Sequence, residues 1–249
     1  ISTRQKNLNI LFVTHYSKKY GVGHLSRCNK LSKKLKKKNK VYFLLDEKDK
    51  NLSKIISKNS NIIIKKNIFN KSNELIKIIK ELKNPIVILD SYLSNFKFEK
   101  KIISHCKKLV IIDDLKKKHC CDIYINPNLL SFKFTKKITA KYKLLGTKFS
   151  FIDLPIVKNK KKKITKFKNI LVFMGATDSK NLSNKIYNAV SMKKLNYLKF
   201  NFIRGLKNKK LKNTKKNNKF KNIRFIDFSK NFSNYLRKTD FFISSGGSS

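Results

Sequence analysis

Short apolar runs alternate with amphipathic stretches along the first half of the chain. The runs are rich in β-branched and aromatic residues with few polar interruptions, which is typical of strands buried on both faces. Strands are expected at Ile10–Thr14, Val41–Leu45, Asn61–Ile64, Ile86–Leu89, Leu109–Ile112 and Ile123–Ile125. Between them, His24–Lys38 and Ser72–Leu82 each place apolar residues on one helical face. This alternation predicts a doubly wound parallel sheet.

The pattern breaks between Ser131 and Lys168 and then restarts. The break contains Pro155 and the basic run Lys158–Lys163, and we interpret it as a linker. Beyond it, strands are expected at Asn169–Phe173, Lys199–Ile203, Ile223–Phe225 and Phe241–Ser244. Helices are expected at Asn181–Val190 and Phe228–Arg237. The sequence therefore predicts an α/β protein of two Rossmann-like domains, each a doubly wound parallel sheet, with a ligand cleft between them.

The expected domain boundaries follow from these patterns. The first domain covers residues 1–152, a linker covers 153–168, and the second domain covers 169–249. We expect the second domain to be incomplete, because the sequence stops at Ser249 within a glycine-rich loop.

The charge is strongly unbalanced, with 61 Lys and Arg against 14 Asp and Glu, a formal net charge of +47. A polyanion-binding protein would have such a balance. Only 5 of the 61 are arginine, however, and recognition of bases and phosphates favours the bidentate arginine fork. The lysines are also spread along the chain, as in a gene of strong A/T bias. We therefore expect no specific nucleic-acid partner.

The cysteines and the lengths of the apolar runs indicate in which cellular compartment the protein is expected. Cys28, Cys106, Cys120 and Cys121 form no CxxC pair, and we expect buried thiols in a reducing, cytoplasmic setting. The spacing of His119 and the two cysteines after it is too tight for a zinc site. No apolar run approaches the roughly 18 residues of a membrane span, and no signal sequence is visible.

Three glycine-containing loops each follow an expected strand: Tyr20–His24, Met174–Asp178 and Ser244–Ser249. Glycine allows positive φ and close approach of the backbone to a ligand. The helix that follows such a loop offers free amides and a partial positive charge. A single loop of this kind is often only a tight turn, but two of them in the second domain fit a diphosphate.

His24 is the histidine best placed for chemistry. It follows the first glycine loop, and an imidazole pKa near 6.5 suits a general base; the alternative is a histidine that packs or caps at a helix start. We favour a structural role for His15, although it lies near the same loop. His105, in an expected helix, and His119, in a lysine-rich loop, are expected to be structural or solvated.

The segment "GVGH", with Arg27 three residues after the histidine, resembles the Gly-x-Gly-His-x-x-Arg loop of a GT-B-like family. That family comprises the UDP-sugar hydrolases of pseudaminic acid biosynthesis and their spore-coat polysaccharide relatives. Further segments match it in order over nearly the whole chain: "LDSY" (89–92), "IDD" (112–114), "CDIYINPN" (121–128), "LLGTKFSFI" (144–152), "MGATDSKNLS" (174–183) and "ISSGGSS" (243–249). The loop at Gly175 departs from the family, which usually has a second glycine where this chain has Ala176.

The resemblance implies hydrolysis of a UDP-linked 2,4-diacetamido-2,4,6-trideoxy sugar to free sugar and UDP. Water attacks the anomeric carbon with inversion, and neither a metal nor another cofactor is expected. His24 and Tyr92 match the catalytic positions. The expected substrate-binding residues are Gly21, Gly23, Arg27, Asp90 and Asp113. The expected UDP-binding residues are Gly175, Thr177, Ser245, Gly246, Gly247 and Ser248.

Four aspartates keep alternative roles. Asp90, Asp113 and Asp114 end expected strands, and they either orient His24 or sugar hydroxyls, or cap the turns that follow. Asp178 is expected to cap the next helix.

Two other functions remain open. A GT-B glycosyltransferase with a UDP-sugar donor would share the fold, the UDP loops and the histidine. A basic polyanion-binding protein would explain the lysines but not the glycine loops. The oligomeric state is not predicted.

Overall fold

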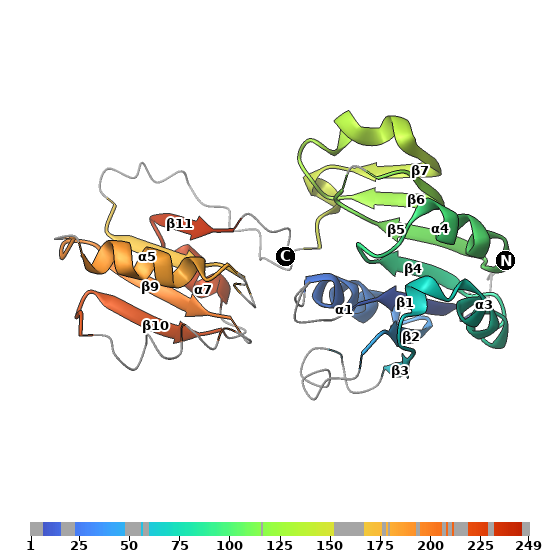
Figure 1. Cartoon of the computed structure of the whole chain (residues 1–249), viewed down its shortest axis with the longest axis horizontal. Helices are drawn as coiled ribbons and strands as arrows, with labels where there is room; N and C mark the ends of the chain where they lie inside the picture. Colours follow the sequence, from blue (N-terminus) through green and yellow to red (C-terminus); the bar gives the residue numbers. More distant parts are fainter. Residues whose placement is uncertain are drawn as a thin grey trace, which may run out of the picture. The chain divides into compact units, whose positions relative to one another are not determined.

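The structure of the protein is a computed structural model. It describes residues 7–15, 23–47, 56, 60–115, 117–151, 167–175, 178, 180–192, 195–205, 208, 211, 219–228 and 232–245. These residues belong to two compact units, one within 1–152 and one within 153–247 (Figure 1).

In its described residues, the first unit contains a seven-stranded parallel sheet in the order β3-β2-β1-β4-β5-β6-β7. The strands are β1 (Asn9–Thr14), β2 (Lys40–Leu45), β3 (Asn61–Ile64), β4 (Ile86–Asp90), β5 (Lys108–Ile112), β6 (His119–Asn126) and β7 (Ile138–Leu145). The strand order reverses between β1 and β4, so the carboxyl ends of these two strands form the topological switch point of the sheet.

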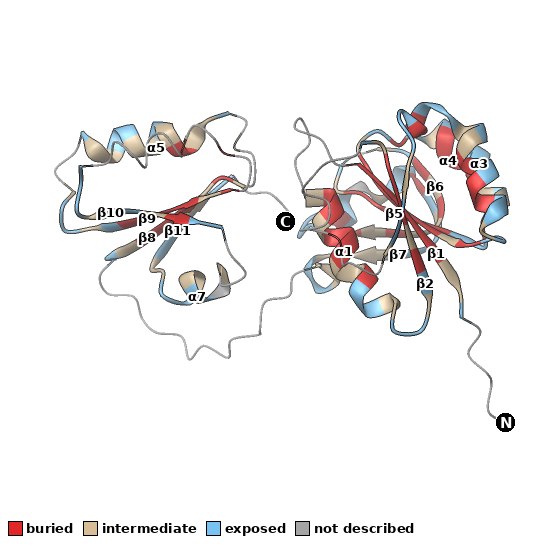
Figure 2. Cartoon of the chain, turned by 90° about the horizontal axis from the view of Figure 1, so that it is seen from below, coloured by how far each residue is buried: buried red, intermediate tan, exposed pale blue. Residues whose placement is uncertain are grey.

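Helices cover both faces of this sheet. α1 (Gly23–Leu35) lies on one face, and α3 (Ser72–Glu81) and α4 (Phe96–Ile102) lie on the other (Figure 2). Successive residues of β1 point to opposite faces: Phe12 packs in the core with Leu25 of α1, whereas Leu11 packs in the core with Leu75 of α3. Four short 3₁₀ turns complete the described part of the unit: η1 (Ile68–Asn70), η2 (Ile103–His105), η3 (Ser131–Lys137) and η4 (Thr147–Phe149).

The second unit repeats the topology on a smaller scale. Its described residues contain a four-stranded parallel sheet in the order β10-β9-β8-β11. The strands are β8 (Asn169–Phe173), β9 (Lys199–Arg204), β10 (Ile223–Asp227) and β11 (Phe241–Ser244). α5 (Leu182–Ser191) packs on one face and α7 (Phe232–Arg237) on the other (Figure 2). The switch point of this sheet lies between β8 and β11.

The predicted fold class, two doubly wound parallel sheets, is confirmed. Every strand expected from an apolar run is present, with small shifts at the ends. The interpretation of Ser131–Lys168 as a linker is wrong for its first part, because η3 and β7 lie there. β7 is an edge strand with largely exposed, lysine-rich positions, so it lacks the continuous apolar run of a buried strand. The expectation of a loop at His119 is also wrong, because this residue begins β6 and is buried.

Two further expectations concerned buried cysteine thiols and membrane-spanning segments. Cys28, Cys106 and Cys121 are buried free thiols, as expected, whereas Cys120 is half-buried. No helix in the described ranges has both the length and the apolar character needed to span a membrane.

Candidate active site

The switch point of the first sheet brings together three chain segments. In the sheet register Thr14 of β1 lies beside Asp90 of β4, so the residues that follow these strands leave the sheet at the same edge. The Thr14 hydroxyl donates to the Asp90 carbonyl over 2.8 Å, which ties the two strand ends together. α1 begins at Gly23 and presents His24 and Arg27 to this edge.

Asp90 is the centre of a buried polar cluster. Its carboxylate is fully buried and accepts two bonds from Arg27, Nε to Oδ2 at 2.5 Å and Nη2 to Oδ1 at 2.6 Å. The Nδ1 atom of His24 lies 2.6 Å from Oδ1 of the same carboxylate. Arg27 also pairs with Asp114, with 3.7 Å between Nη1 and Oδ2. Arg27, which binds in a bidentate manner, and His24 therefore share the carboxylate of Asp90 at the switch point.

The charge of Asp90 fixes the proton on His24. Burial disfavours ionisation of Asp90, but the charge and hydrogen bonds of Arg27, with the bond from His24, outweigh it and hold the pKa of Asp90 below its ordinary value. An ionised carboxylate only accepts hydrogen bonds, so the 2.6 Å contact places the proton on Nδ1 of His24. Nη2 of Arg27, which is also a donor, lies farther from the same nitrogen, at 3.0 Å. In the neutral ring Nε2 is then the basic nitrogen, which is the tautomer that a general base requires.

Two aromatic rings flank His24. The ring of Tyr92 packs edge to face against the His24 ring, with 4.3 Å between the two ring centroids. The centroid of the His15 ring lies 4.5 Å from that of His24. Burial, followed by the charge and hydrogen bond of Asp114, raises the pKa of the Tyr92 hydroxyl. Tyr92 therefore stays a neutral phenol whose hydroxyl interacts with Asp114 beside the imidazole.

His15 is a buried neighbour of His24, with its Nδ1 atom 2.6 Å from the Ser91 hydroxyl. That hydroxyl also accepts from the amide of Leu93, so its hydrogen is available for Nδ1 of His15. Burial and the nearby His24 lower the pKa of His15 to about 4. A neutral His15 places no second positive charge beside the proposed base.

We expect nuclear magnetic resonance to show His15 as a neutral ring, protonated at Nε2, that does not titrate between pH 5 and pH 8. Its folded pKa lies below the unfolded value of 6.5, so its contribution to stability is present above pH 6.5 and is lost as the pH falls toward 4. A His15 midpoint near 6.5 would contradict this assignment.

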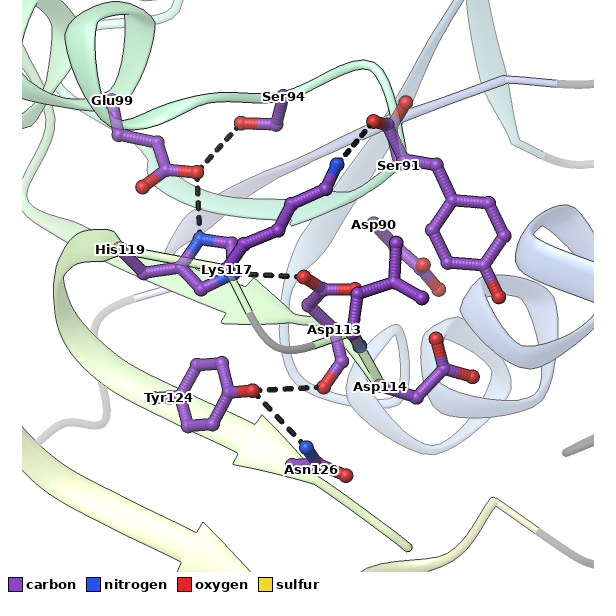
Figure 3. A network of polar contacts seen from close by, with 12 residues as sticks. Asp90, Ser91, Ser94, Glu99, Asp113, Asp114, Lys117, His119, Tyr124 and Asn126 are labelled. Atoms are coloured by element: carbon purple, nitrogen blue, oxygen red, sulfur yellow. Dashed lines mark hydrogen bonds and ion pairs between the residues drawn. The ribbon is translucent and has the colours of Figure 1, made fainter. Parts of the chain in front are cut away.

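A second buried network lies beside the first, around His119 (Figure 3). Nε2 of His119 is 2.8 Å from Oδ2 of Asp113, and Nδ1 is 2.9 Å from Oε1 of Glu99. The other oxygen of Asp113 accepts from the amide of Leu115 over 3.1 Å. Both carboxylate oxygens of Asp113 therefore have partners within the protein, and its predicted contact with substrate stays a prediction.

The second switch point, between β8 and β11, carries the predicted UDP-binding residues that the structure describes. Gly175 and Ser245 follow these paired strands at the same sheet edge. Gly175 has φ +83°, a conformation that favours glycine over other residues. Asp178 accepts from the amides of Leu182 and Ser183 at 2.8 and 2.9 Å, which confirms its role as a cap of α5.

The predicted site residues divide into four groups, one of which is Asp113 alone, in the network around His119. His24, Arg27, Asp90 and Tyr92 come together at the first switch point, and Gly23 opens the helix that carries two of them. Gly175 and Ser245 lie at the second switch point. The remainder, Gly21, Thr177, Gly246, Gly247 and Ser248, lie outside the described residues.

The sequence interpretation missed the contact between His15 and His24 and the partners of His119. A signal existed for His15, which directly follows β1 at the switch point. In the described part of the chain, no group of three or more histidine, cysteine, aspartate or glutamate side chains has the arrangement of a metal site.

Comparison with known proteins adds information on the fold. No family model matches the chain. The uncharacterised protein MJ1062 of Methanocaldococcus jannaschii is 28% identical over 194 residues, which cover 72% of this chain and 39% of that protein. The match therefore spans about two fifths of the relative's length.

Solved structures match nearly the whole chain at low identity. MurG of Acinetobacter baumannii has a TM-score of 0.61 at 12% identity, covering 97% of this chain and 72% of that one. The S. aureus MnaA–UDP complex has a TM-score of 0.58 at 13% identity, covering 97% and 75%. UDP-GlcNAc 2-epimerase of Neisseria meningitidis, bound to UDP-GlcNAc, has a TM-score of 0.56 at 14% identity, covering 97% and 78%. The chain thus has the GT-B-like α/β fold of these three structures.

Proposed function

We propose that this chain belongs to an enzyme that hydrolyses a UDP-linked 2,4-diacetamido-2,4,6-trideoxy sugar to the free sugar and UDP, a step of pseudaminic acid biosynthesis. The observation that carries the proposal is the bond between His24 and the buried carboxylate of Asp90 at the switch point. It leaves the basic nitrogen of His24 available to take a proton from water. Two of the solved structures with this fold hold UDP or a UDP-sugar, which supports the substrate class.

In the proposed reaction, water attacks the anomeric carbon while Nε2 of His24 accepts one of its protons. The bond between the anomeric carbon and the diphosphate oxygen breaks, and UDP leaves with that electron pair. A single displacement inverts the anomeric configuration. Asp90 stabilises the imidazolium that forms, because the carboxylate already accepts the Nδ1 proton.

UDP would be held by the loops after β8 and β11 in the second unit. Gly175 and Ser245 are the described members of these loops, and backbone amides of this kind stabilise the charge that develops on a departing diphosphate. Asp178 already occupies the amides of Leu182 and Ser183 at the start of α5. We therefore assign the diphosphate to the loop backbones rather than to those two amides.

The alternative is transfer of the sugar to an acceptor hydroxyl, with His24 deprotonating the acceptor instead of water. The same cluster would serve both reactions. Incubation without any acceptor separates them, because only hydrolysis then releases free sugar.

We expect the full-length protein to release UDP and free sugar, without acceptor, from one member of a panel of UDP-linked 2,4-diacetamido sugars. His24→Gln should abolish this turnover because it removes the base. His105→Gln is the matched control, since η2 precedes β5 and lies at the opposite edge of the parallel sheet from the switch point. Tight UDP binding without turnover would favour the transferase, and equal loss in both variants would contradict a specific role for His24.

A further inference from the structure

His119 forms an unusual buried arrangement in which both ring nitrogens face carboxylates. Glu99 comes from α4 and Asp113 follows β5, so the contacts of His119 at the start of β6 join a helix to the end of a strand. All three side chains are buried, with exposed fractions of 1% for His119, 0% for Glu99 and 3% for Asp113. The arrangement thus lies inside the fold, where ion pairs are little screened by solvent.

The geometry fixes the charge of His119. Ionised carboxylates only accept hydrogen bonds, so each ring nitrogen must donate and the ring is an imidazolium. Burial lowers the pKa of His119, but the bonds and charges of Asp113 and Glu99 outweigh it and raise that pKa to about 9. Two further titratable side chains lie near it, Tyr124 and Cys121, and burial raises the pKa of each to about 12. Neither of these two side chains therefore titrates in the range of His119.

The network connects two loops that carry site residues. Oε1 of Glu99 also accepts from Ser94 in the loop after β4 over 2.7 Å, while Asp113 begins the loop after β5. Lys117 makes a second connection between the loops, with 2.5 Å from its Nζ to the carbonyl of Tyr92 (Figure 3). These contacts hold the loop after β4 and the loop after β5 against each other.

The same two loops reach the polar cluster around Asp90. Tyr92 contacts the His24 ring from the loop after β4. Asp114, next to Asp113 in the loop after β5, pairs with Arg27, which in turn holds Asp90. A change in the spacing of the two loops would therefore move Tyr92, which contacts the His24 imidazole, relative to Asp114, which pairs with Arg27.

We propose that His119 is a positioning residue of the candidate active site. As an imidazolium between Glu99 and Asp113, it holds the loops after β4 and β5 together and so places Tyr92 against His24 and Asp114 against Arg27. This inference rests on the proposed function for its kinetic consequence, but the tie between the loops is a structural property that can be measured without turnover.

The kinetic test uses Glu99→Gln in the full-length protein, with turnover of the UDP-sugar and the His119 resonances both followed from pH 6 to pH 10. In the wild type we expect kcat to fall as the pH rises through about 9. Glu99→Gln removes one of two carboxylates, so the pKa of His119 and the alkaline fall in kcat should both move down by roughly one to three pH units. KM should change less than kcat, because UDP is assigned to the other unit.

Glu74→Gln is the matched control. This change neutralises a glutamate on α3 whose ion pair with Lys71 is exposed to solvent. We expect the decrease of kcat at alkaline pH to stay at the same pH in this variant. An alkaline fall that stays fixed in Glu99→Gln, while the His119 midpoint moves, would overturn the positioning role. So would a constant wild-type kcat through the pH at which His119 loses its proton.

Hydrogen exchange tests the tie independently of activity. The amides of Leu93, Leu115 and Cys120 donate to side chains of the two loops and of Glu99. Their protection factors should fall together as His119 deprotonates, and the fall should occur at lower pH in Glu99→Gln. Absence of turnover at every pH would refute the proposed function alone, whereas unchanged protection across the His119 titration would refute the tie.

Discussion

Replacement of Asp90 by asparagine is expected to lower kcat for UDP-sugar hydrolysis on the order of 10³–10⁴-fold. The introduced amide can donate toward Nδ1 of His24, which favours the tautomer with the proton on Nε2. That ring can no longer accept a proton from water, and the imidazolium loses its balancing charge. Measurement of kcat and KM over pH 5–9 should show the loss in kcat at every pH.

The control for this change is Asp122→Asn. Asp122 pairs with Lys108 over 2.8 Å and accepts from the amide of Leu109, but it lies on β6 outside the Asp90 cluster. Urea unfolding of both variants would show whether lost activity reflects lost folding. Activity of Asp90→Asn within tenfold of the control, in a folded protein, would contradict the tautomer argument.

The fold could be predicted because buried parallel strands leave a strong local signal. Ile10–Thr14 and Asn169–Phe173 are apolar on both faces, and the helices between strands repeat their apolar residues at helical spacing. β7 (Ile138–Leu145) gave no such signal, because the middle of this edge strand is exposed to water and carries lysines. Edge strands are therefore where a pattern of apolar runs is least informative.

The candidate site was only partly predictable. The position of His24 after a glycine loop marked it, and the position of Asp90 at a strand end left two roles open. The sequence does not indicate which carboxylate reaches the imidazole, because that depends on strand order: β4 lies beside β1, whereas β5 lies one strand further away. His119 depends still more on tertiary structure, since Glu99 is 20 residues away in sequence.

Arg27→Met is expected to cost about 3–5 kcal/mol of unfolding free energy near pH 7, because it leaves the carboxylate of Asp90 buried with too few partners. Arg204→Met is the matched control, as its partner Asp227 is exposed to solvent and the pair should contribute only about 0–1 kcal/mol. Urea unfolding at several pH values would measure both changes.

The pH dependence separates a lost ion pair from lost packing at Arg27. In the wild type the folded pKa of Asp90 is lowered, so its stabilisation is present above the unfolded value near 3.9 and is lost as the pH falls below it. Without Arg27, burial raises that pKa above the unfolded value, and the folded state then binds more protons than the unfolded state. The free-energy difference between wild type and Arg27→Met should therefore be smallest at the acid end, below pH 4, and grow toward pH 7. A difference independent of pH would mean that Arg27 contributes by packing, and the charge of Asp90 would then need another source of stabilisation.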